Sequence, residues 1–508
     1  MSSSIKLTNS SGKIVTITNP DTTSADVAVD LLNNAYTIAT VDDFGTVPVG
    51  YTTVIVKDTD RGGVFNRIAS TTANGGTIFD GTTGYSWERQ YSGAVNVKWF
   101  GAVGDGVTDD TAAIQAAIDY VGATGFGGTI LFPSGDYKIV GGSNGLTIPS
   151  EQLIHLVGEG MDSTALRYYG SGTAVGMSGT SGHMVQKSSI EGMAIYNTGT
   201  TGVYGIYIEY GTLLDFRNVR TYGFTVGVSV INSWNLQFDS VVSDSNTQDG
   251  FLLSTANANA ILMLSCQGVG NGRAGLYIDG GQAIDIVGCT WEANTQYGVY
   301  LNGGATFRTL NVTLSGCYIE GNGVYEVYID SDTAYIPYGV TIRDCYFEYI
   351  STKAVAAIRV VDVYGLVIEG CTFDNQGGAY ANSLNMTSGG SISNVTLGTN
   401  TDRSSSGVYS EVYYDNKPVL ATKAYAQFNG ITSATVNNSF GISGVVRDAV
   451  GEYTVTLNHA MPDTNYVVIG TAENGSAVGA LILSAHVLTT STFKIYTSSG
   501  AAAIDGRN

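Results

Sequence analysis

Acidic residues recur at a regular interval through the middle of the chain. Each lies three residues after a cysteine or a valine that itself recurs every 23 to 28 residues; they are Asp244, Glu292, Glu320, Glu348 and Asp374. Two carboxyl groups that lie close together can divide acid and base roles, because one can hold a proton while the other stays ionised. Hydrolysis of a glycosidic bond requires that division of roles. We therefore take Asp244, Glu292, Glu320 and Glu348 as candidate catalytic residues.

The cysteines explain why these acids should lie near one another. They stand at intervals of 23, 28, 28 and 26 residues, at Cys266, Cys289, Cys317, Cys345 and Cys371. Met193, Val219 and Val241 continue the spacing toward the N-terminus. A repeat of this length with one position always small or apolar predicts a solenoid whose coils stack that position into a buried ladder. Each coil contains three short strand-like runs, so we expect a parallel β-helix.

Alternation along a strand predicts which side chains face outward. If the cysteine points inward, the second residue after it does so too, and the first and third face outward. The second position holds large apolar residues such as Trp291, which we expect in the core rather than against a sugar. The acids at the third position then form one outward column, with adjacent coils about 4.8 Å apart.

Carboxylates stacked at that spacing repel one another unless a proton, a cation or a sugar hydroxyl lies between them. Neighbouring coils match the ~5 Å separation of retaining glycosidases, whereas alternate coils, at about 10 Å, lie just beyond the inverting range. The spacing therefore does not choose between the two mechanisms. The alternative is that acids such as Glu320 close a turn and are simply solvated.

Hydroxyl and aromatic groups stand beside the acids. The first position after the cysteine holds Tyr318 and Tyr346 in two successive coils, and we expect both to bind substrate because sugars favour mixed polar and aromatic surfaces. Asp249, Arg273 and Gln296 follow the next turn and are further candidates for the same groove, or else solvated turn residues. A second outward column, Tyr277, Tyr300 and Tyr328, could pack between subunits or bind sugar.

The composition narrows the class of function. The chain has 508 residues, 67 of them glycine and 32 tyrosine, with 13 % charged residues and a formal charge of −20. This balance argues against binding to nucleic acid or to an anionic membrane, because both require basic patches. The cysteines form no C-x-x-C pair, so we predict neither a metal site nor a cofactor. No apolar run could span a bilayer and no signal-peptide core is present, so we expect a soluble protein made in the cytoplasm.

Changes in pattern along the chain predict three domains. We expect a small β-rich segment over residues 1–95, the β-helix over 96–408 and a β-sandwich over 409–508. A helix is predicted near residues 109–121, with Thr108 or Asp109 as its N-cap and an apolar stripe facing the solenoid.

Two motifs resemble those of a known family. The stretch Trp99–Asp119, WFGAVGDGVTDDTAAIQAAID, and then Gly127–Tyr137, GGTILFPSGDY, resemble the start of the pectate-lyase-like right-handed β-helix of phage tailspikes and capsule depolymerases. Ile5–Lys13 is similar to the N-terminal part of phage tail proteins. The resemblance implies a homotrimer in the virion tail, attached to the phage tail or an adaptor protein through its N-terminal segment. It also implies a central body that cleaves bacterial surface polysaccharide, and a C-terminal domain for trimerisation or carbohydrate binding.

The resemblance does not indicate which reaction the protein catalyses, because hydrolases, lyases and inactive fibres share the fold. A lyase that acts on uronates needs a base together with a cation, and residues 193–375 contain one Lys, six Arg and no His. We therefore expect a tailspike depolymerase that works by glycoside hydrolysis. The alternatives are a polysaccharide lyase on the same fold and a non-enzymatic glycan-binding tail fibre.

Overall fold

The computed structural model describes residues 4–8, 14–18, 35–82, 84–199, 202–304, 306–331, 335–348, 356–374, 382–386, 391–402, 413–414, 417–418, 425–429, 434–458, 461, 464, 466–471 and 482–498. Residues 9–13 of the tail-like segment Ile5–Lys13 lie outside this set. The chain divides into two compact units, one made of residues 1–381 and 391–409 and the other of residues 382–390 and 410–508.

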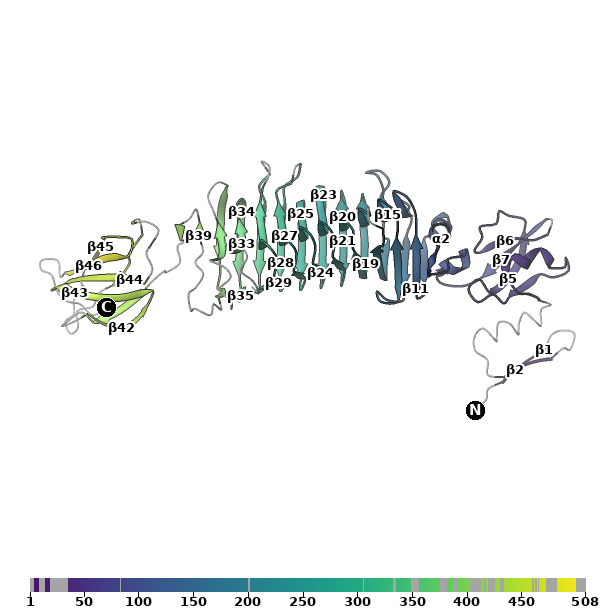
Figure 1. Ribbon diagram of the computed structural model, residues 1–508, viewed down its shortest axis with the longest axis horizontal. Coiled ribbons are helices and arrows are strands. Elements are labelled where there is room, and N and C mark those ends of the chain that lie inside the picture. Colours follow the sequence, from purple (N-terminus) through teal and green to yellow (C-terminus); the bar gives the residue numbers. More distant parts are fainter. Residues whose placement is uncertain are drawn as a thin grey trace. The chain divides into compact units, whose positions relative to one another are not determined.

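A solenoid of about ten coils dominates the first unit (Figure 1). Each coil adds one strand to each of three parallel sheets, which we call sheets A, B and C. Sheet A contains β11 (Gly135–Ile139), β14 (Thr164–Tyr168), the second halves of β17 (Ser189–Asn197) and β19 (Gly211–Tyr222), β22 (Val242–Asp244), β24 (Gln267–Val269), β26 (Thr290–Glu292), β29 (Tyr318–Glu320), β32 (Tyr346–Glu348), β35 (Thr372–Asp374) and β38 (Thr401–Asp402).

Sheets B and C complete each coil. Sheet B contains β12 (Asn144–Ile148), β15 (Thr173–Ser178), β18 (Tyr204–Glu209), β20 (Val226–Ile231), the first parts of β23 (Asp249–Leu264) and β25 (Ala274–Val287), β27 (Tyr297–Asn302), β30 (Tyr325–Asp330) and β33 (Ala356–Val360). Sheet C contains β10 (Gly128–Phe132), β13 (Ile154–Gly158), the first halves of β17 and β19, β21 (Trp234–Asp239), the last parts of β23 and β25, β28 (Leu310–Ser315), β31 (Tyr338–Arg343), β34 (Val363–Glu369) and β37 (Ile392–Leu397). The short strand β16 (Val185–Gln186) pairs with the start of β19.

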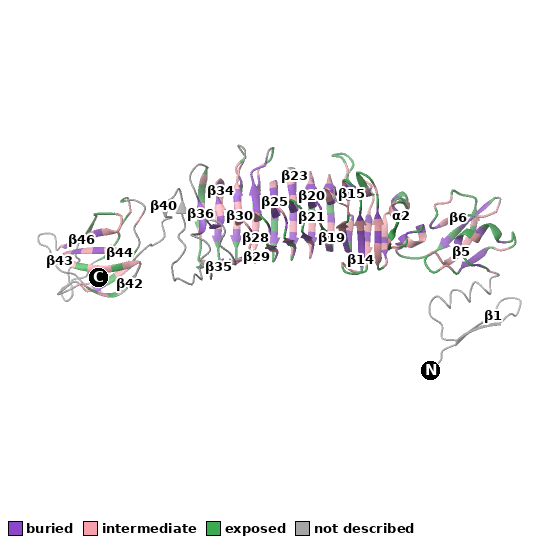
Figure 2. Cartoon of the chain, in the orientation of Figure 1, coloured by how far each residue is buried: buried purple, intermediate pink, exposed green. Residues whose placement is uncertain are grey.

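The predicted cysteine ladder is confirmed. All five cysteines are free thiols and are buried between sheets C and A. The thiol of Cys266 donates to the carbonyl of Phe238 at 3.4 Å, and that of Cys317 to the carbonyl of Ile286 at 3.5 Å, in each case on the preceding coil. Trp291 is fully buried, so its predicted place in the core is also confirmed. Figure 2 shows this buried interior running through the stacked strands.

An asparagine ladder, which the repeat pattern did not reveal, holds the turn between sheets A and B. The Nδ2 group of Asn271 donates to Oδ1 of Asn294 at 2.9 Å, and that of Asn294 to Oδ1 of Asn322 at 2.8 Å. The ladder begins at Asn246 and ends on the buried carboxylate of Glu326, which accepts from Asn322. Each asparagine lies two residues after a position of the acidic column, so the ladder also holds the ends of the sheet A strands.

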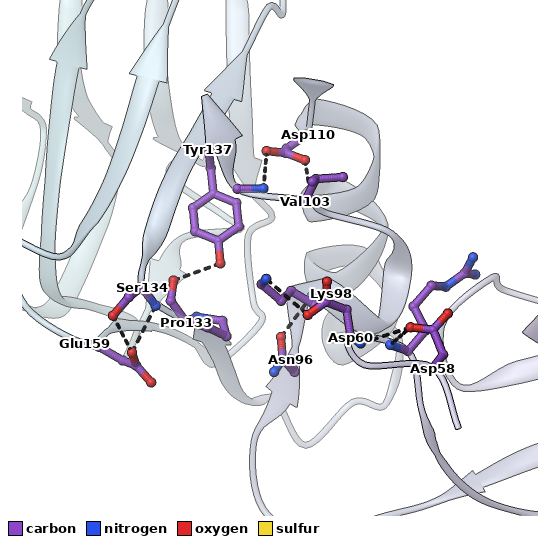
Figure 3. Close-up of polar contacts among 12 residues, drawn as sticks. Asp58, Asp60, Asn96, Lys98, Val103, Asp110, Pro133, Ser134, Tyr137 and Glu159 are labelled. Carbon is purple, nitrogen blue, oxygen red and sulfur yellow. Dashed lines mark hydrogen bonds and ion pairs between the residues drawn. The ribbon is translucent and has the colours of Figure 1, made fainter. Parts of the chain in front are cut away.

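The N-terminal end of the solenoid differs from the prediction in the bounds of its helix. The helix α2 runs over Thr111–Ala123 with Asp110 at the N-cap, instead of starting at residue 109 with Thr108 or Asp109 as the cap. The shift arises because β9 (Asp105–Asp109) pairs with β11, whereas α2 begins after it. The Asp110 carboxylate turns away from the helix and accepts the N–H groups of Val103 at 2.6 Å and of Gly104 at 3.1 Å (Figure 3). Burial raises the pKa of Asp110, although these hydrogen bonds oppose the shift.

Other polar residues of this region also serve the fold. The Tyr137 hydroxyl donates to the carbonyl of Pro133 at 2.8 Å, and the Glu159 carboxylate accepts from both the backbone and the hydroxyl of Ser134 (Figure 3). Lys98 forms an ion pair with Asp60 at 3.2 Å. At the same end of the solenoid, β8 (Val95–Asn96) pairs with β10 and is followed by the 3-10 helix η2 (Val97–Phe100).

The strands on the N-terminal side of the solenoid are antiparallel except for one pair. The strands β1 (Ser4–Thr8) and β2 (Ile14–Thr18) form a hairpin. A five-stranded sheet follows, in the order β3 (Tyr36–Ile38), β4 (Thr53–Val56), β5 (Gly63–Ala69), β7 (Tyr85–Gln90) and β6 (Ile78–Asp80). In this sheet β3 is parallel to β4, and the 3-10 helix η1 (Val41–Thr46) lies between them in the chain. The sheet packs around Phe44, Phe65 and Trp87.

The second unit contains two antiparallel sheets around one core. They are β41 (Tyr425–Asn429) with β42 (Thr435–Phe440), and β43 (Ile442–Ala449), β44 (Glu452–Leu457), β46 (Thr492–Ser498) and β45 (Ile482–Val487). Phe428 from the first sheet and Tyr453 and Phe493 from the second share that core. The unit also includes β36 (Asn382–Met386), β39 (Tyr413–Tyr414) and β40 (Lys417–Pro418). Within the described residues, no helix is both long and apolar enough to cross a membrane.

Candidate active site on sheet A

The outward face of sheet A carries two parallel columns of side chains. The strand register pairs Glu292 with Glu320, Glu320 with Glu348, and Glu348 with Asp374, each on the next coil. The predicted alignment of these acids on consecutive coils is therefore confirmed. The neighbouring column is formed by Thr290, Tyr318, Tyr346 and Thr372.

Tyr318 joins two of the acids. Its hydroxyl oxygen lies 2.5 Å from Oε2 of Glu320 on its own strand and 2.7 Å from Oε2 of Glu348 on the next coil. The two carboxyl oxygens are therefore at most about 5.2 Å apart, because their separation cannot exceed the sum of these two distances. Retaining glycosidases hold their carboxyl groups about 5–5.5 Å apart. We call these three residues the Tyr318 triad.

The Tyr318 hydroxyl is protonated in this arrangement. A phenol has a single O–H, so the Tyr318 hydroxyl can donate to only one of the two carboxyl groups at a time. Burial raises the pKa of Tyr318, and its hydrogen bonds to Glu320 and Glu348 raise it further. The phenol therefore stays protonated at neutral pH.

The next coil repeats part of this arrangement. The rings of Tyr318 and Tyr346 stack at 5.6 Å with 9° between their planes, and the Tyr346 hydroxyl donates to Oδ2 of Asp374 at 2.9 Å. The acids are more buried than the expected outward column implies, with Glu320 9 % exposed and Asp374 1 % exposed. The physical reason is that tyrosines of the neighbouring column bond to them. Glu348 is the more exposed acid of the triad.

The other two candidate acids lie apart from the Tyr318 triad. Glu292 is on the preceding coil, half-buried, and its carboxylate makes no hydrogen bond or ion pair within the described residues. Asp244 lies two coils from Glu292 toward the N-terminus, and Val269 holds the same position on the coil between them. It is 9 % exposed and accepts from Arg220 through Nε at 3.0 Å and Nη2 at 2.6 Å. The structure thus brings together Glu320 and Glu348 and places Glu292 in register with Glu320 on the preceding coil, whereas Asp244 is separated from them.

Three predicted substrate-binding residues lie beyond the asparagine ladder, at the start of the sheet B strands. Asp249 is fully buried and accepts from Nε of Arg273 at 2.8 Å and also from its Nη2. The Arg273 guanidinium lies over the ring of Tyr277 at 4.2 Å. The backbone N–H of Gln296 donates to the carbonyl of Arg273 at 3.1 Å. Asp249 therefore holds Arg273 in place, and these residues do not join the face of sheet A.

The second tyrosine column forms a ladder on the outward face of sheet B. The rings of Tyr277 and Tyr300 stack at 4.6 Å with 13° between their planes, and those of Tyr300 and Tyr328 at 5.0 Å. Tyr277 and Tyr300 are each only 8 % exposed. Because the ring faces cover one another, this column presents few free aromatic faces to a sugar.

Four residues that were not predicted extend the columns of sheet A toward the N-terminus. Tyr222 pairs in register with Asp244 and with Tyr196 on the preceding coil, and Tyr196 pairs with Arg167. Arg220 stands in the tyrosine column. The signal was present in the sequence, because Arg220 and Tyr222 are the first and third residues after Val219, and Tyr196 is the third after Met193.

The residues that the structure describes include no candidate metal site. Within the part of the chain that the structure describes, no group of three or more His, Cys, Asp or Glu residues could hold a metal ion.

Comparison with known proteins finds similarity in both sequence and fold. A family model described as rhamnogalacturonase A/epimerase, pectate lyase-like, matches residues 94–381. Mannuronan C5-epimerase AlgE1 of Azotobacter vinelandii is 57 % identical over 76 residues, which is 14 % of this chain and 5 % of that protein. The chain thus spans only a small fraction of the curated relatives that it matches.

Two solved phage structures share the fold. The enzymatically active domain of tailspike protein 4 of bacteriophage CBA120 superimposes with a TM-score of 0.57 at 13 % identity, covering 97 % of this chain and 79 % of that one. The tailspike gp49 of Acinetobacter baumannii bacteriophage Fri1, a capsular polysaccharide depolymerase, gives a TM-score of 0.51 at 11 % identity, covering 92 % and 96 %.

Proposed function

Because the chain belongs to the rhamnogalacturonase A/epimerase family of pectate lyase-like proteins, we propose that it is a tailspike depolymerase that cleaves a bacterial surface polysaccharide by glycoside hydrolysis. The observation that carries the proposal is the Tyr318 triad, in which one phenol joins two carboxyl groups on adjacent coils. The solved tailspike gp49, a capsular polysaccharide depolymerase of the same fold, supports the substrate class.

The triad supplies the two roles of a retaining mechanism. One carboxyl group donates its proton to the oxygen of the leaving sugar, while the other, as carboxylate, attacks the anomeric carbon from the opposite side. Because Glu348 is the more exposed of the two, we assign it the attack and assign Glu320 the role of the acid. Tyr318 orients both carboxyl groups through its hydroxyl. Water then releases the sugar from Glu348, with Glu320 acting as the base.

The position of the protein in a virion is part of the same proposal. The N-terminal segment, residues 1–95, would attach a homotrimer to the phage tail or to an adaptor protein, and residues 409–508 would trimerise it or bind carbohydrate. The similarity in fold to phage tailspikes supports a place in the virion tail. The active site would then act on the surface of the bacterium.

Digestion of purified capsular polysaccharides by the full-length protein tests the proposal. We expect new reducing ends and a fall in viscosity for the capsule of a host strain, without ultraviolet-absorbing unsaturated products. Unsaturated products would instead support a lyase. Binding to the host capsule without any cleavage would contradict the enzyme and support a glycan-binding fibre.

One observation favours a second candidate, an alginate epimerase or lyase. It is the 57 % identity over 76 residues with mannuronan C5-epimerase AlgE1. Either reaction would begin by removing the proton next to a uronate carboxyl group, which requires a base and a cation, and Arg220 beside Tyr222 offers these residue types on one face. Incubation of mannuronan with the protein in D₂O distinguishes the candidates, because epimerisation incorporates deuterium into the polymer, elimination by a lyase gives unsaturated ends, and hydrolysis does neither.

A further inference from the structure

We propose that Arg167, Tyr196, Arg220 and Tyr222 form a subsite for a single acidic sugar, so that the substrate is a heteropolysaccharide with one acidic residue per repeat unit. This inference rests on the proposed function and names the substrate class of the same face. We call these four residues the arginine–tyrosine cluster.

The aromatic rings of the cluster hold its arginines in place. The Arg167 guanidinium lies 5.2 Å from the centre of the Tyr196 ring, and that of Arg220 lies 5.8 Å from the Tyr222 ring. The two rings contact each other edge to face at 5.8 Å. Such contacts restrict the long side chains before a ligand arrives, which lowers the entropic cost of binding.

Both arginines keep N–H groups that a ligand could use. Arg220 directs Nε and Nη2 to Asp244, and Arg167 directs Nε to Asp136 at 2.9 Å. Within the described residues, Nη1 of Arg220 and both Nη groups of Arg167 make no hydrogen bond, and each side chain is 36 % exposed. A guanidinium with free N–H groups is well suited to a carboxylate, which it can bind through two parallel hydrogen bonds.

The two outward columns of sheet A, which together we call the strip, have the opposite charge around the Tyr318 triad. From Thr290 to Asp374 the two outward columns of sheet A contain hydroxyl, aromatic and carboxyl side chains and no cation. A polymer with a carboxylate on every sugar would be repelled over the Tyr318 triad. A polymer whose acidic residue falls on the arginine–tyrosine cluster and whose other residues are neutral fits the whole strip.

The register gives the distance between the two regions. Arg220 is four coils from Tyr318 through Val242, Gln267 and Thr290, and adjacent coils are about 4.8 Å apart. Arg167 lies two coils further away, through Tyr196. The acidic sugar would therefore lie about 19 to 29 Å from the cleaved bond along the solenoid axis. This spacing separates the expected substrate from mannuronan, in which acidic residues are continuous.

The test uses one polymer in two forms. The probes are a host capsular polysaccharide with one uronic acid per repeat unit and the same polymer after chemical reduction of its carboxyl groups to alcohols. For the wild-type protein, reduction should raise KM about tenfold, the loss of one charge-assisted contact, with kcat unchanged. The dissociation constant of each polymer is measured in parallel, so that the subsite is tested even if no cleavage occurs.

Variants connect that loss to the cluster. Arg167→Gln, and the double change Arg220→Gln with Asp244→Asn that leaves no unpaired buried charge, should each raise KM for the native polymer and make the protein insensitive to carboxyl reduction. The matched control is Arg217→Gln, because Arg217 pairs with Asp215 at 2.5 Å on the same strand, β19, but outside sheet A. It should behave as wild type.

Two results would overturn the inference. One is a wild-type protein whose KM and dissociation constant do not change on carboxyl reduction. The other is an Arg167→Gln variant that is as sensitive to reduction as wild type. If neither polymer is cleaved but the dissociation constants follow the expected pattern, the hydrolase proposal fails and the acidic subsite stands.

Discussion

The Tyr318 side chain is the point at which two acids from different coils meet. Its hydroxyl contacts Glu320 and Glu348 at 2.5 and 2.7 Å, and the ring stacks on Tyr346. Neighbouring carboxylates in most stacked columns would only repel one another. Here the Tyr318 hydroxyl lies between the two acids and can donate a hydrogen bond to either one.

A prediction for the phenol follows from the direction of its pKa shift. Burial and the bonds to the two glutamates disfavour the phenolate of Tyr318, so its pKa lies above its usual value. Unperturbed tyrosines ionise near pH 10. In a spectroscopic titration to about pH 11, wild type and Tyr318→Phe should therefore show the same number of tyrosinates. One additional tyrosinate in wild type over that range would contradict the hydrogen bonds of the Tyr318 hydroxyl to the two glutamates.

The sequence was sufficient to predict some of these contacts and not others. The cysteine interval predicts which acids are neighbours and which face they share, because the strand period is two and the coils stack in register. It does not predict that Asp244 pairs with Arg220 or that Asp249 is fully buried under Arg273. Those contacts depend on side-chain conformations and on the packing of adjacent coils.

At the scale of elements, the asparagine ladder sets the position of the acidic column. Each ladder residue lies two residues after the end of the sheet A strand of its coil. The Oδ1 atoms of Asn271, Asn294 and Asn322 each accept the backbone N–H of the asparagine before them, as Asn294 does for Asn271 at 2.9 Å. Asparagine is common in turns, so its repetition carried little signal before the coils were stacked. The helix α2 shows the opposite case, since its existence was predicted and only its bounds differ, displaced by the pairing of β9.

Loss of one ladder residue should destabilise the solenoid. Asn294→Ala removes the acceptor for the backbone N–H of Asn271 and the donor to Gly268 in the interior, and a buried group left without a partner costs about 1–3 kcal/mol. We expect a lower midpoint of urea unfolding. The control is Asn144→Ala, at an exposed position of β12, which should leave the midpoint unchanged. Equal midpoints for both variants would show that the ladder does not stabilise the fold.

At the scale of the whole molecule, the three sheets of the solenoid offer different surfaces. Sheet A carries the acidic and arginine-containing strip, and sheet B carries tyrosines that mainly contact one another. The formal charge of −20 is in keeping with a substrate that is largely neutral over the Tyr318 triad. The proposed assembly of three such solenoids would present three of these strips to the polysaccharide.

The mass of the protein in solution tests that assembly. A homotrimer of the 53.1 kDa chain has a mass of about 159 kDa, and light scattering after gel filtration should give this value independently of concentration. A mass of 53.1 kDa at all concentrations would contradict the trimer. It would leave the Tyr318 triad unaffected, because all of its atoms belong to one chain.

The most direct test of the central claim compares three conservative substitutions on the same polysaccharide. Glu320→Gln and Glu348→Gln should each lower the rate of release of reducing ends by at least about 100-fold, because the first removes the proposed acid and the second the proposed attacking carboxylate. Asp330→Asn is the matched control, since Asp330 accepts from Tyr328 two residues earlier on the face of sheet B, and it should keep the wild-type rate. Circular dichroism should show the same fold in all three variants. Rates near wild type for Glu320→Gln and Glu348→Gln would contradict the assignment of these two residues.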